Sequence, residues 1–387
     1  MQFDGVFIIN QLKKKFQPML RGTFLALFFV LFTGCTKDAP EVPKPCPDNQ
    51  ELINLSSRNF QMGFTSWPYG PELNDVETTY DFIHSHGDIY AEHIDDHIPW
   101  SAWMNGTKLP DAFTENIAFR LSKKPANQPL LLSVSILNNS RDDLAEDFNG
   151  NTPHYAHINH RDIENAYVKH LEYLVEQFQP DYLVLGIEVN EMWINANPKW
   201  PGFKNLMLNI QFRIKQTYPD LMVSQSVTLH NWYEPGFYGA EDYIEEITEL
   251  VNGFDFAAIS FYPFLKGLHH EDEFQRALDF VHNRVHKPIA FVETAHNAAD
   301  ISLPSLNLFI QGSPCEQKAY LEILLLNAHK NQYEFIIWWA HRDFDALLSS
   351  FPPELVDLGK IWRDTGLLDE NGNARPAFEV WANIMED

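Results

Sequence analysis

Apolar residues gather in short runs that recur between residues 60 and 340 of this chain. Most of the runs are nearly continuous, which is the pattern of parallel strands that are buried on both faces. We therefore predict strands at 60–65, 87–94, 129–137, 182–188, 221–228, 256–262, 288–293 and 335–340.

Amphipathic patterns with the period of an α-helix lie between these runs. They predict helices at 76–84, 115–123, 163–178, 204–218, 243–251, 272–285, 316–330 and 376–385. A regular alternation of strand and helix over this length favours a closed barrel over an open sheet. The predicted fold class is α/β, a single (β/α)8 TIM barrel in one domain at 51–387.

The N-terminal segment differs from the rest of the chain. Basic residues precede an apolar run at 23–32, which is shorter than the roughly 20 residues of a membrane-spanning helix. Small residues then lead to Cys35, and the segment resembles a bacterial lipoprotein signal peptide. The resemblance implies that 1–35 is a signal peptide ending at a lipidated Cys35. With 36–50 as a charged, proline-rich tether, we expect a lipid anchor to the bacterial outer membrane or cell surface, or to its periplasmic side.

The formal net charge is −25, and such an acidic surface repels nucleic acid, so we expect no nucleic-acid partner. Acidity of this kind is typical of soluble proteins. Beyond Cys35 the chain has Cys46 and Cys315, for which an exported compartment permits a disulfide that their spacing does not indicate. We expect a monomer.

Two acidic side chains are expected at the mouth of the barrel, where the active sites of this fold lie. Glu293 directly follows the apolar run 288–292, so it ends the seventh strand. A carboxylate buried there lowers stability unless it is paired, which indicates a functional role. The fourth strand offers Glu188 and Glu191. Glu188 requires a strand of the same length as the sixth, whereas Glu191 requires a longer one, so we favour Glu188.

Three segments carry a resemblance to a known family: 180–188 (PDYLVLGIE), 259–264 (ISFYPF) and 292–295 (VETA). In order and spacing they resemble glycoside hydrolase clan A, and within it most nearly the endo-β-1,4-galactanases of family 53. The resemblance implies a retaining hydrolase of β-linked polysaccharide, either galactan-like or another β-glycan. It also implies that the enzyme is endo-acting and cleaves bonds within the polysaccharide. It also implies that Glu293 is the nucleophile and Glu188 the acid/base.

The chain departs from the clan pattern at two places. Ile187 stands where the clan usually has an asparagine, and the second strand lacks an expected arginine. Asn190 and Glu191 offer an Asn-Glu pair three residues after Ile187, which keeps Glu191 as the alternative acid.

Polar and aromatic residues near the strand ends are expected to bind the polysaccharide or oligosaccharide, because sugar rings stack on flat aromatic faces. The resemblance implies in addition that Tyr262 donates a hydrogen bond to the nucleophile. The candidate substrate-binding residues are Asn190, Glu191, Tyr262, Trp67, His93, Trp193, Trp232, His296, Trp338 and Trp339. Trp362 and Trp381 lie in the C-terminal segment and are expected to be packing residues.

Two other interpretations remain. His154, His157 and His160 recur every third residue, but this spacing outside a helical pattern is a poor ligand geometry, so we expect neither a metal site nor a cofactor. The second is a carbohydrate-binding surface lipoprotein that kept the barrel without catalysis. Its aromatic cleft would not require both Glu188 and Glu293.

Overall fold

The computed structural model describes residues 45–53, 57–125, 127–304, 307–351 and 353–386. The proposed signal peptide, Cys35 and most of the tether lie outside these residues. Within the described part of the chain, no helix has the length and apolar character to cross a bilayer.

A single parallel sheet forms the centre of the molecule, with its strands in the order β5-β4-β3-β2-β1-β11-β8-β7-β6. The strands are β1 (Gln61–Thr65), β2 (Ile89–Ile94), β3 (Leu130–Val134), β4 (Tyr182–Val184), β5 (Met222–Ser224), β6 (Ser226–Thr228), β7 (Ala257–Phe261), β8 (Ile289–Thr294) and β11 (Phe335–Trp338). Gln225 alone separates β5 from β6, and β5 pairs with β4 while β6 pairs with β7. β5 and β6 are therefore two parts of one predicted strand, through which the barrel closes.

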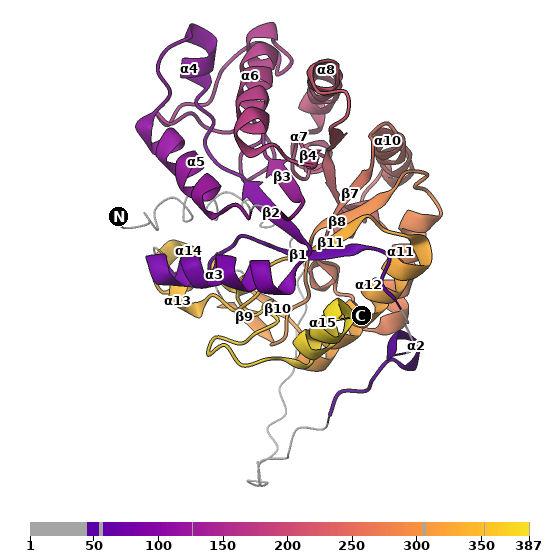
Figure 1. Ribbon diagram of the computed structural model, residues 1–387. Helices are drawn as coiled ribbons and strands as arrows, with labels where there is room; N and C mark the ends of the chain where they lie inside the picture. Colours follow the sequence, from indigo (N-terminus) through magenta and orange to yellow (C-terminus); the bar gives the residue numbers. More distant parts are fainter. Residues whose placement is uncertain (1–44, 54–56, 126, 305–306, 352, 387) are drawn as a thin grey trace.

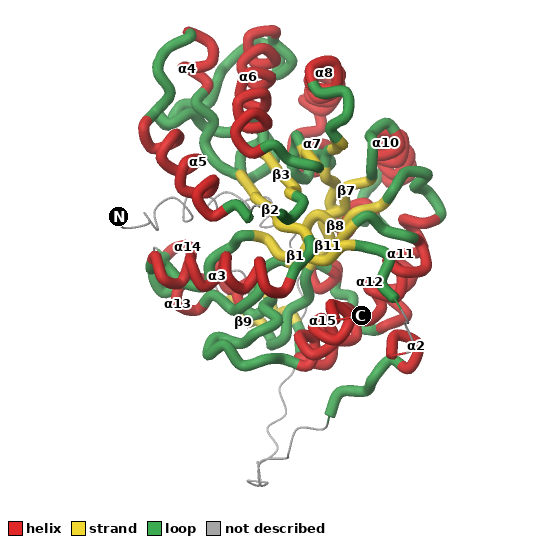
Figure 2. The backbone as a smooth tube through the Cα atoms, in the orientation of Figure 1, coloured by secondary structure: helices red, strands yellow, loops and turns green. Residues whose placement is uncertain are grey.

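Helices surround this sheet, as Figures 1 and 2 show. The predicted helices are α3 (Leu73–His86), α5 (Asp111–Lys123), α6 (Arg161–Phe178), α8 (Trp200–Thr217), α10 (Ala240–Asn252), α11 (Glu271–His282), α12 (Pro314–Asn331) and α15 (Pro376–Glu386). The eight strand segments and the TIM-barrel fold predicted from the sequence are confirmed.

Short elements between the strands and the main helices were not predicted, because most of them are too short to show a periodic pattern. They are α2 (Gln50–Ile53), α4 (Trp100–Asn105), α7 (Glu191–Ala196), η2 (Asn197–Lys199), α9 (Leu229–Trp232), η3 (Pro263–Lys266), α13 (Asp345–Leu348), α14 (Pro353–Arg363) and the hairpin of β9 (Ile301–Leu303) with β10 (Leu308–Ile310). Most follow the carboxyl end of a strand, so they shape the mouth of the barrel.

The hydrophobic core has two parts because side chains alternate between the faces of a strand. In β2, Ile89 and Ala91 belong to a cluster that fills the inside of the barrel, while Tyr90 belongs to the larger cluster beneath the helices. Ile187, at the position where an asparagine was expected, is a member of the inner cluster and is 2% exposed. It therefore serves the core of the barrel.

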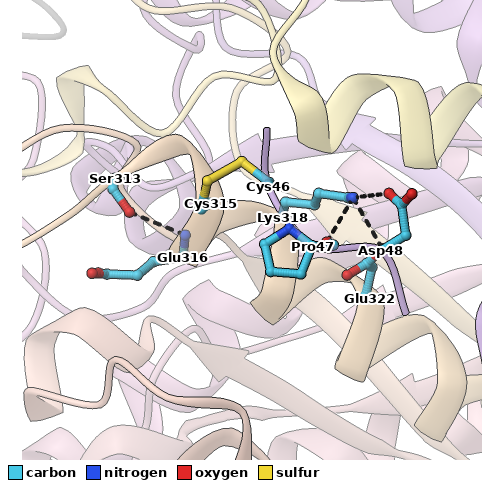
Figure 3. The surroundings of a disulfide bond; sticks show 8 residues. All are labelled: Cys46, Pro47, Asp48, Ser313, Cys315, Glu316, Lys318 and Glu322. Carbon is cyan, nitrogen blue, oxygen red and sulfur yellow. Dashed lines mark hydrogen bonds and ion pairs between the residues drawn. A yellow bond between two sulfur atoms is a disulfide. The ribbon is translucent and has the colours of Figure 1, made fainter. Parts of the chain in front are cut away.

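A disulfide joins Cys46 to Cys315, a pairing that the sequence left open. Cys315 lies in the first turn of α12, where the Ser313 side chain caps the helix by accepting a hydrogen bond from the Glu316 backbone N–H. Lys318 of the same helix pairs with Asp48 (Figure 3). The N-terminal end of the described chain is thus fastened to α12.

Candidate active site

One pocket lies at the carboxyl ends of the strands, the edge at which barrel active sites are built. We call it the barrel-mouth pocket. It is lined by Trp67, His93, Asp95, Asn139, Arg141, Tyr262, Glu293, Trp339, Phe344, Gly359 and Trp362. Acidic, basic and aromatic side chains from six strand ends and from α14 therefore meet in one place.

Glu293 and Asp95 are the two carboxylates that line this pocket. Glu293 lies in β8, is 5% exposed, and accepts a hydrogen bond from the Tyr262 hydroxyl. Burial and the negative charge of Glu293 raise the pKa of Tyr262 well above its usual value, so the hydroxyl remains protonated and donates. His93 Nδ1 lies 3.5 Å from Glu293 Oε2, on the second strand, where the sequence lacks the expected arginine. Tyr262 is thus bonded to one oxygen of Glu293, and His93 lies near the other.

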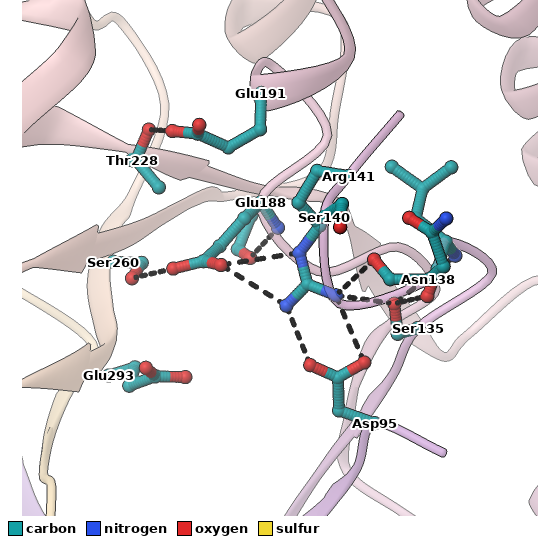
Figure 4. Close-up of polar contacts among 12 residues, drawn as sticks. Asp95, Ser135, Asn138, Ser140, Arg141, Glu188, Glu191, Thr228, Ser260 and Glu293 are labelled. Atoms are coloured by element: carbon teal, nitrogen blue, oxygen red, sulfur yellow. Dashed lines mark hydrogen bonds and ion pairs between the residues drawn. The ribbon is translucent and has the colours of Figure 1, made fainter. Parts of the chain in front are cut away.

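Glu188 follows β4 and is 3% exposed, but it is not among the residues that line the pocket. Its Oε2 accepts hydrogen bonds from Nη2 and Nε of Arg141, at 3.1 and 3.3 Å, and its Oε1 accepts one from Ser260 Oγ at 3.1 Å (Figure 4). The backbone φ of Glu188 is 53°, in the left-handed region that residues other than glycine rarely adopt. Its backbone N–H donates to Ser226 Oγ at 2.8 Å, which fixes this conformation.

Arg141 lines the pocket and was not among the site residues predicted from the sequence, and the same is true of its partner Asp95. Its guanidinium forms a bidentate ion pair with Asp95 (Nη1–Oδ1 3.0 Å, Nη2–Oδ2 2.6 Å) while it contacts Glu188. It is 3% exposed, and its φ is 52°. Removing one partner of a buried charge leaves the other unpaired at a high cost in stability, so Asp95, Arg141 and Glu188 depend on one another. The signal in the sequence was a basic residue in the loop that follows the third strand.

Glu191 has a different environment from Glu188. It is the first residue of α7, and its Oε1 accepts hydrogen bonds from Thr228 Oγ1 and Asn231 Nδ2, both at 2.5 Å. In Figure 4 its carboxylate points to Thr228. Burial, together with the charge of Glu188, raises the pKa of Glu191. Asn190 is fully buried, and its side-chain amide is bonded to Thr228, so it contributes to the core at this turn.

The predicted substrate-binding residues divide into two groups. Trp67, His93, Tyr262 and Trp339 line the barrel-mouth pocket, whereas the lining does not include Asn190, Glu191, Trp193, Trp232, His296 or Trp338. Trp232 and Trp338 are fully buried, and their indole N–H groups donate to the backbone carbonyls of Ile244 and Thr365. Trp193 packs against Trp200. A position near a strand end did not reveal on which side the side chain lies.

Aromatic side chains give the pocket both flat faces and hydrogen-bond donors. Trp362, which the sequence suggested as a packing residue, lines the pocket from α14, while Trp381 is fully buried against Phe64 as expected. The indole N–H groups of Trp67 and Trp339 are buried and have no hydrogen-bond partner in the described part of the chain. An unpaired buried donor is unfavourable, so these two groups are suited to a bound hydroxyl.

Comparison with known proteins places the chain among glycosidases. The model of glycosyl hydrolase family 53 matches residues 156–381. No curated protein matches the sequence.

Among solved structures, the GH53 catalytic domain of Ignisphaera aggregans has 17% identity and a TM-score of 0.53, covering 86% of this chain and 93% of its own. Native xylanase 10B of Thermotoga maritima has 13% identity and a TM-score of 0.54, covering 85% and 95%. A GH5_18 protein of Bifidobacterium longum subsp. infantis has 14% identity and a TM-score of 0.59, covering 84% and 79%. At these identities the structures support the fold.

Proposed function

The chain belongs to glycosyl hydrolase family 53 and is a glycoside hydrolase, and from this premise we propose that it cleaves β-linked polysaccharide by a retaining double displacement. The observation that carries the proposal is the Glu293 carboxylate, buried at the pocket and held by Tyr262 and His93. A fixed carboxylate is what a nucleophile at a sugar carbon requires.

Two steps follow from this assignment. In the first, a Glu293 oxygen attacks the anomeric carbon, the glycosidic bond breaks, and the leaving oxygen takes a proton from Glu188. In the second, Glu188 removes a proton from water, the water oxygen attacks the same carbon, and the bond to Glu293 breaks. Retaining pairs lie about 5 to 5.5 Å apart, because one carboxyl attacks from one face while the other serves the leaving group.

Arg141 supports the second step directly. It favours Glu188 as a carboxylate, which is the form that removes a proton from water. For the first step Glu188 must carry a proton, and Arg141 then retains its bidentate pairing with Asp95. Glu191 remains the alternative acid. Glu188 is preferred because it is bonded to Arg141, which lines the pocket, whereas the partners of Glu191, Thr228 and Asn231, do not.

The nucleophile assignment is tested with Glu293→Gln, which keeps the volume of the side chain and removes its charge. We expect turnover to fall about a thousandfold or more, a loss of ~4 kcal/mol of transition-state stabilisation. Substrate binding and the unfolding midpoint should remain close to wild type. A variant with more than a few per cent of wild-type turnover would contradict the assignment.

The proposed substrate is galactan or another β-glycan, cleaved internally. A screen of galactan, β-glucan and mannan, with chromatography of early products, tests both parts. Internal cleavage gives a range of oligosaccharides and a rapid fall in viscosity, whereas release of a single small sugar from the start would contradict it. If none of these polymers is hydrolysed, the proposed substrate class is wrong.

We also propose that the enzyme is anchored to the outer membrane or cell surface through lipid on Cys35. The support is the signal-like segment before this cysteine, whose apolar run is too short for a stable span. Cys35→Ala should move the protein from the membrane fraction to the soluble fraction. Continued membrane partitioning of the variant would argue against the anchor.

A further inference from the structure

Three side chains with metal-binding atoms meet outside the barrel-mouth pocket. His269 precedes α11, His296 follows β8, and Glu316 lies in the first turn of α12. One ligand atom of each lies within 4.8 Å of the other two. Three segments that are separate in the sequence thus converge on one point.

The spacing of the outer two residues matches that of metal ligands. His269 Nδ1 and Glu316 Oε2 are 3.3 Å apart, and both atoms are buried without a hydrogen-bond partner in the described residues. A tetrahedral zinc ion binds histidine nitrogen and carboxylate oxygen at about 2.0 to 2.2 Å, which sets these two atoms ~3.4 Å apart. In Figure 3 the Glu316 side chain points away from Lys318, so that ammonium group does not neutralise it.

The third residue, His296, is fully buried, and each of its ring nitrogens faces a backbone carbonyl oxygen. A neutral imidazole carries one N–H, so it donates a hydrogen bond to only one of these two carbonyl groups. Nδ1 lies 3.0 Å from the Asn297 carbonyl oxygen, and Nε2 lies 3.4 Å from the Leu268 carbonyl oxygen. The proton belongs on the nitrogen with the nearer carbonyl, which leaves the Nε2 lone pair facing an oxygen. Metal-bound histidines have this arrangement, with the second nitrogen donating to a backbone carbonyl.

We propose that His269, His296 and Glu316 bind one divalent transition-metal ion of the zinc type, with water in the fourth position. Two neutral imidazoles and one carboxylate are ligands that suit such an ion. The side chains of His269 and Glu316 are 21% and 18% exposed, which gives the ion a route from solvent. The ion links the loop after η3 and the loop after β8 to α12. His296 lies three residues after Glu293, so the ion braces the chain that carries the nucleophile.

A second acidic group lacks this support. Asp343, Asp345 and Glu370 also lie within reach of one another, but Asp343 already forms a bidentate ion pair with Arg375. A guanidinium therefore occupies the position that a cation would take.

The test uses the exported form of the enzyme, stripped with a chelator and titrated with Zn2+ by calorimetry and with Co2+ by visible absorption. The wild type should bind one equivalent of each, with the intense d–d bands of tetrahedral cobalt. Glu316→Gln keeps the size of the side chain and should weaken binding more than 100-fold, beyond the roughly 10–100-fold that loss of an outer hydrogen-bond partner costs. The control is Asp279→Asn, which removes the charge of a carboxylate that lies 3.8 Å from His282 and accepts a hydrogen bond from Gln275, and it should bind metal as the wild type does.

Thermal unfolding separates a lost site from a damaged fold. Zn2+ should raise the unfolding midpoint of the wild type and of Asp279→Asn but not that of Glu316→Gln or His269→Ala, because only a native site adds binding free energy to folding. The proposal is overturned if the stripped wild type binds neither metal. It is equally overturned if Glu316→Gln still binds one equivalent of metal ion with wild-type affinity, since the ion would then lie elsewhere.

Discussion

Glu188 and Arg141 contact each other through their side chains, and both have a left-handed backbone, with φ of 53° and 52°. This conformation costs about 1–3 kcal/mol for residues other than glycine, and it persists where the surroundings require it. The requirement here is geometric, because the planar guanidinium of Arg141 must reach Asp95 and Glu188 at once. Lysine offers no such fork, so the site depends on an arginine at this position.

The choice between Glu188 and Glu191 belongs to the residue scale. In Glu188→Ala, cleavage of polysaccharide should fall by about 10²–10⁴, because the leaving oxygen receives no proton. An activated aryl glycoside should still react in the first step, since its leaving group departs without that proton. The glycosyl-enzyme should then accumulate, and azide should restore turnover by attacking without a base.

Glu191→Ala is the matched variant for this experiment. We expect it mainly to weaken substrate affinity and to show no rescue by azide, because Glu191 is held by Thr228 and Asn231 and is not the proposed proton donor. If azide rescues Glu191→Ala and not Glu188→Ala, the acid/base assignment is reversed.

At the scale of elements, the packing of α4 against α6 depends on one buried imidazole. Trp103 Nε1–H of α4 donates to His170 Nδ1 of α6 at 3.2 Å, and His170 is 1% exposed. Burial lowers the pKa of His170 to about 3, so the ring is neutral and able to accept this hydrogen bond. A protonated His170 would have no lone pair for Trp103.

This contact predicts a loss of stability in acid. Between pH 6.5 and about 3 the unfolded chain binds a proton at His170 that the folded protein does not bind, so the free energy of unfolding falls as pH falls. The slope from this one group is at most about 1.4 kcal/mol per pH unit. In His170→Asn, Oδ1 can still accept the hydrogen bond from Trp103. The free energy of unfolding, measured with urea at several pH values between 6 and 4, should change less with pH in this variant than in the wild type. Equal slopes would show that His170 does not titrate in this way.

For the whole molecule, the Cys46–Cys315 disulfide connects the start of the described chain to the outer layer of the barrel. The two cysteines are 269 residues apart in the sequence, so the cross-link restricts most of the unfolded chain. The contacts of Lys318 with Asp48 and of Glu322 with the Asn49 backbone hold the same segment to α12.

Loss of this cross-link should destabilise the whole protein. The double variant Cys46→Ser, Cys315→Ser should lose about 2–4 kcal/mol of unfolding free energy in denaturant. A reductant should lower the wild-type midpoint to that of the double variant and leave the variant itself unchanged. A reductant with no effect on the wild type would mean that the disulfide does not contribute.

The sequence by itself determined the fold, because each buried strand leaves a continuous apolar run and the long helices between the strands leave periodic ones. Those patterns located all eight strands and put Glu293 at the end of one of them. Tertiary structure alone decided which side chains meet. Arg141 reaches Glu188 through the fold of a loop, and His296 turns into the protein three residues after Glu293. The directions of such side chains depend on loop conformation and on contacts between distant segments, which no local pattern records.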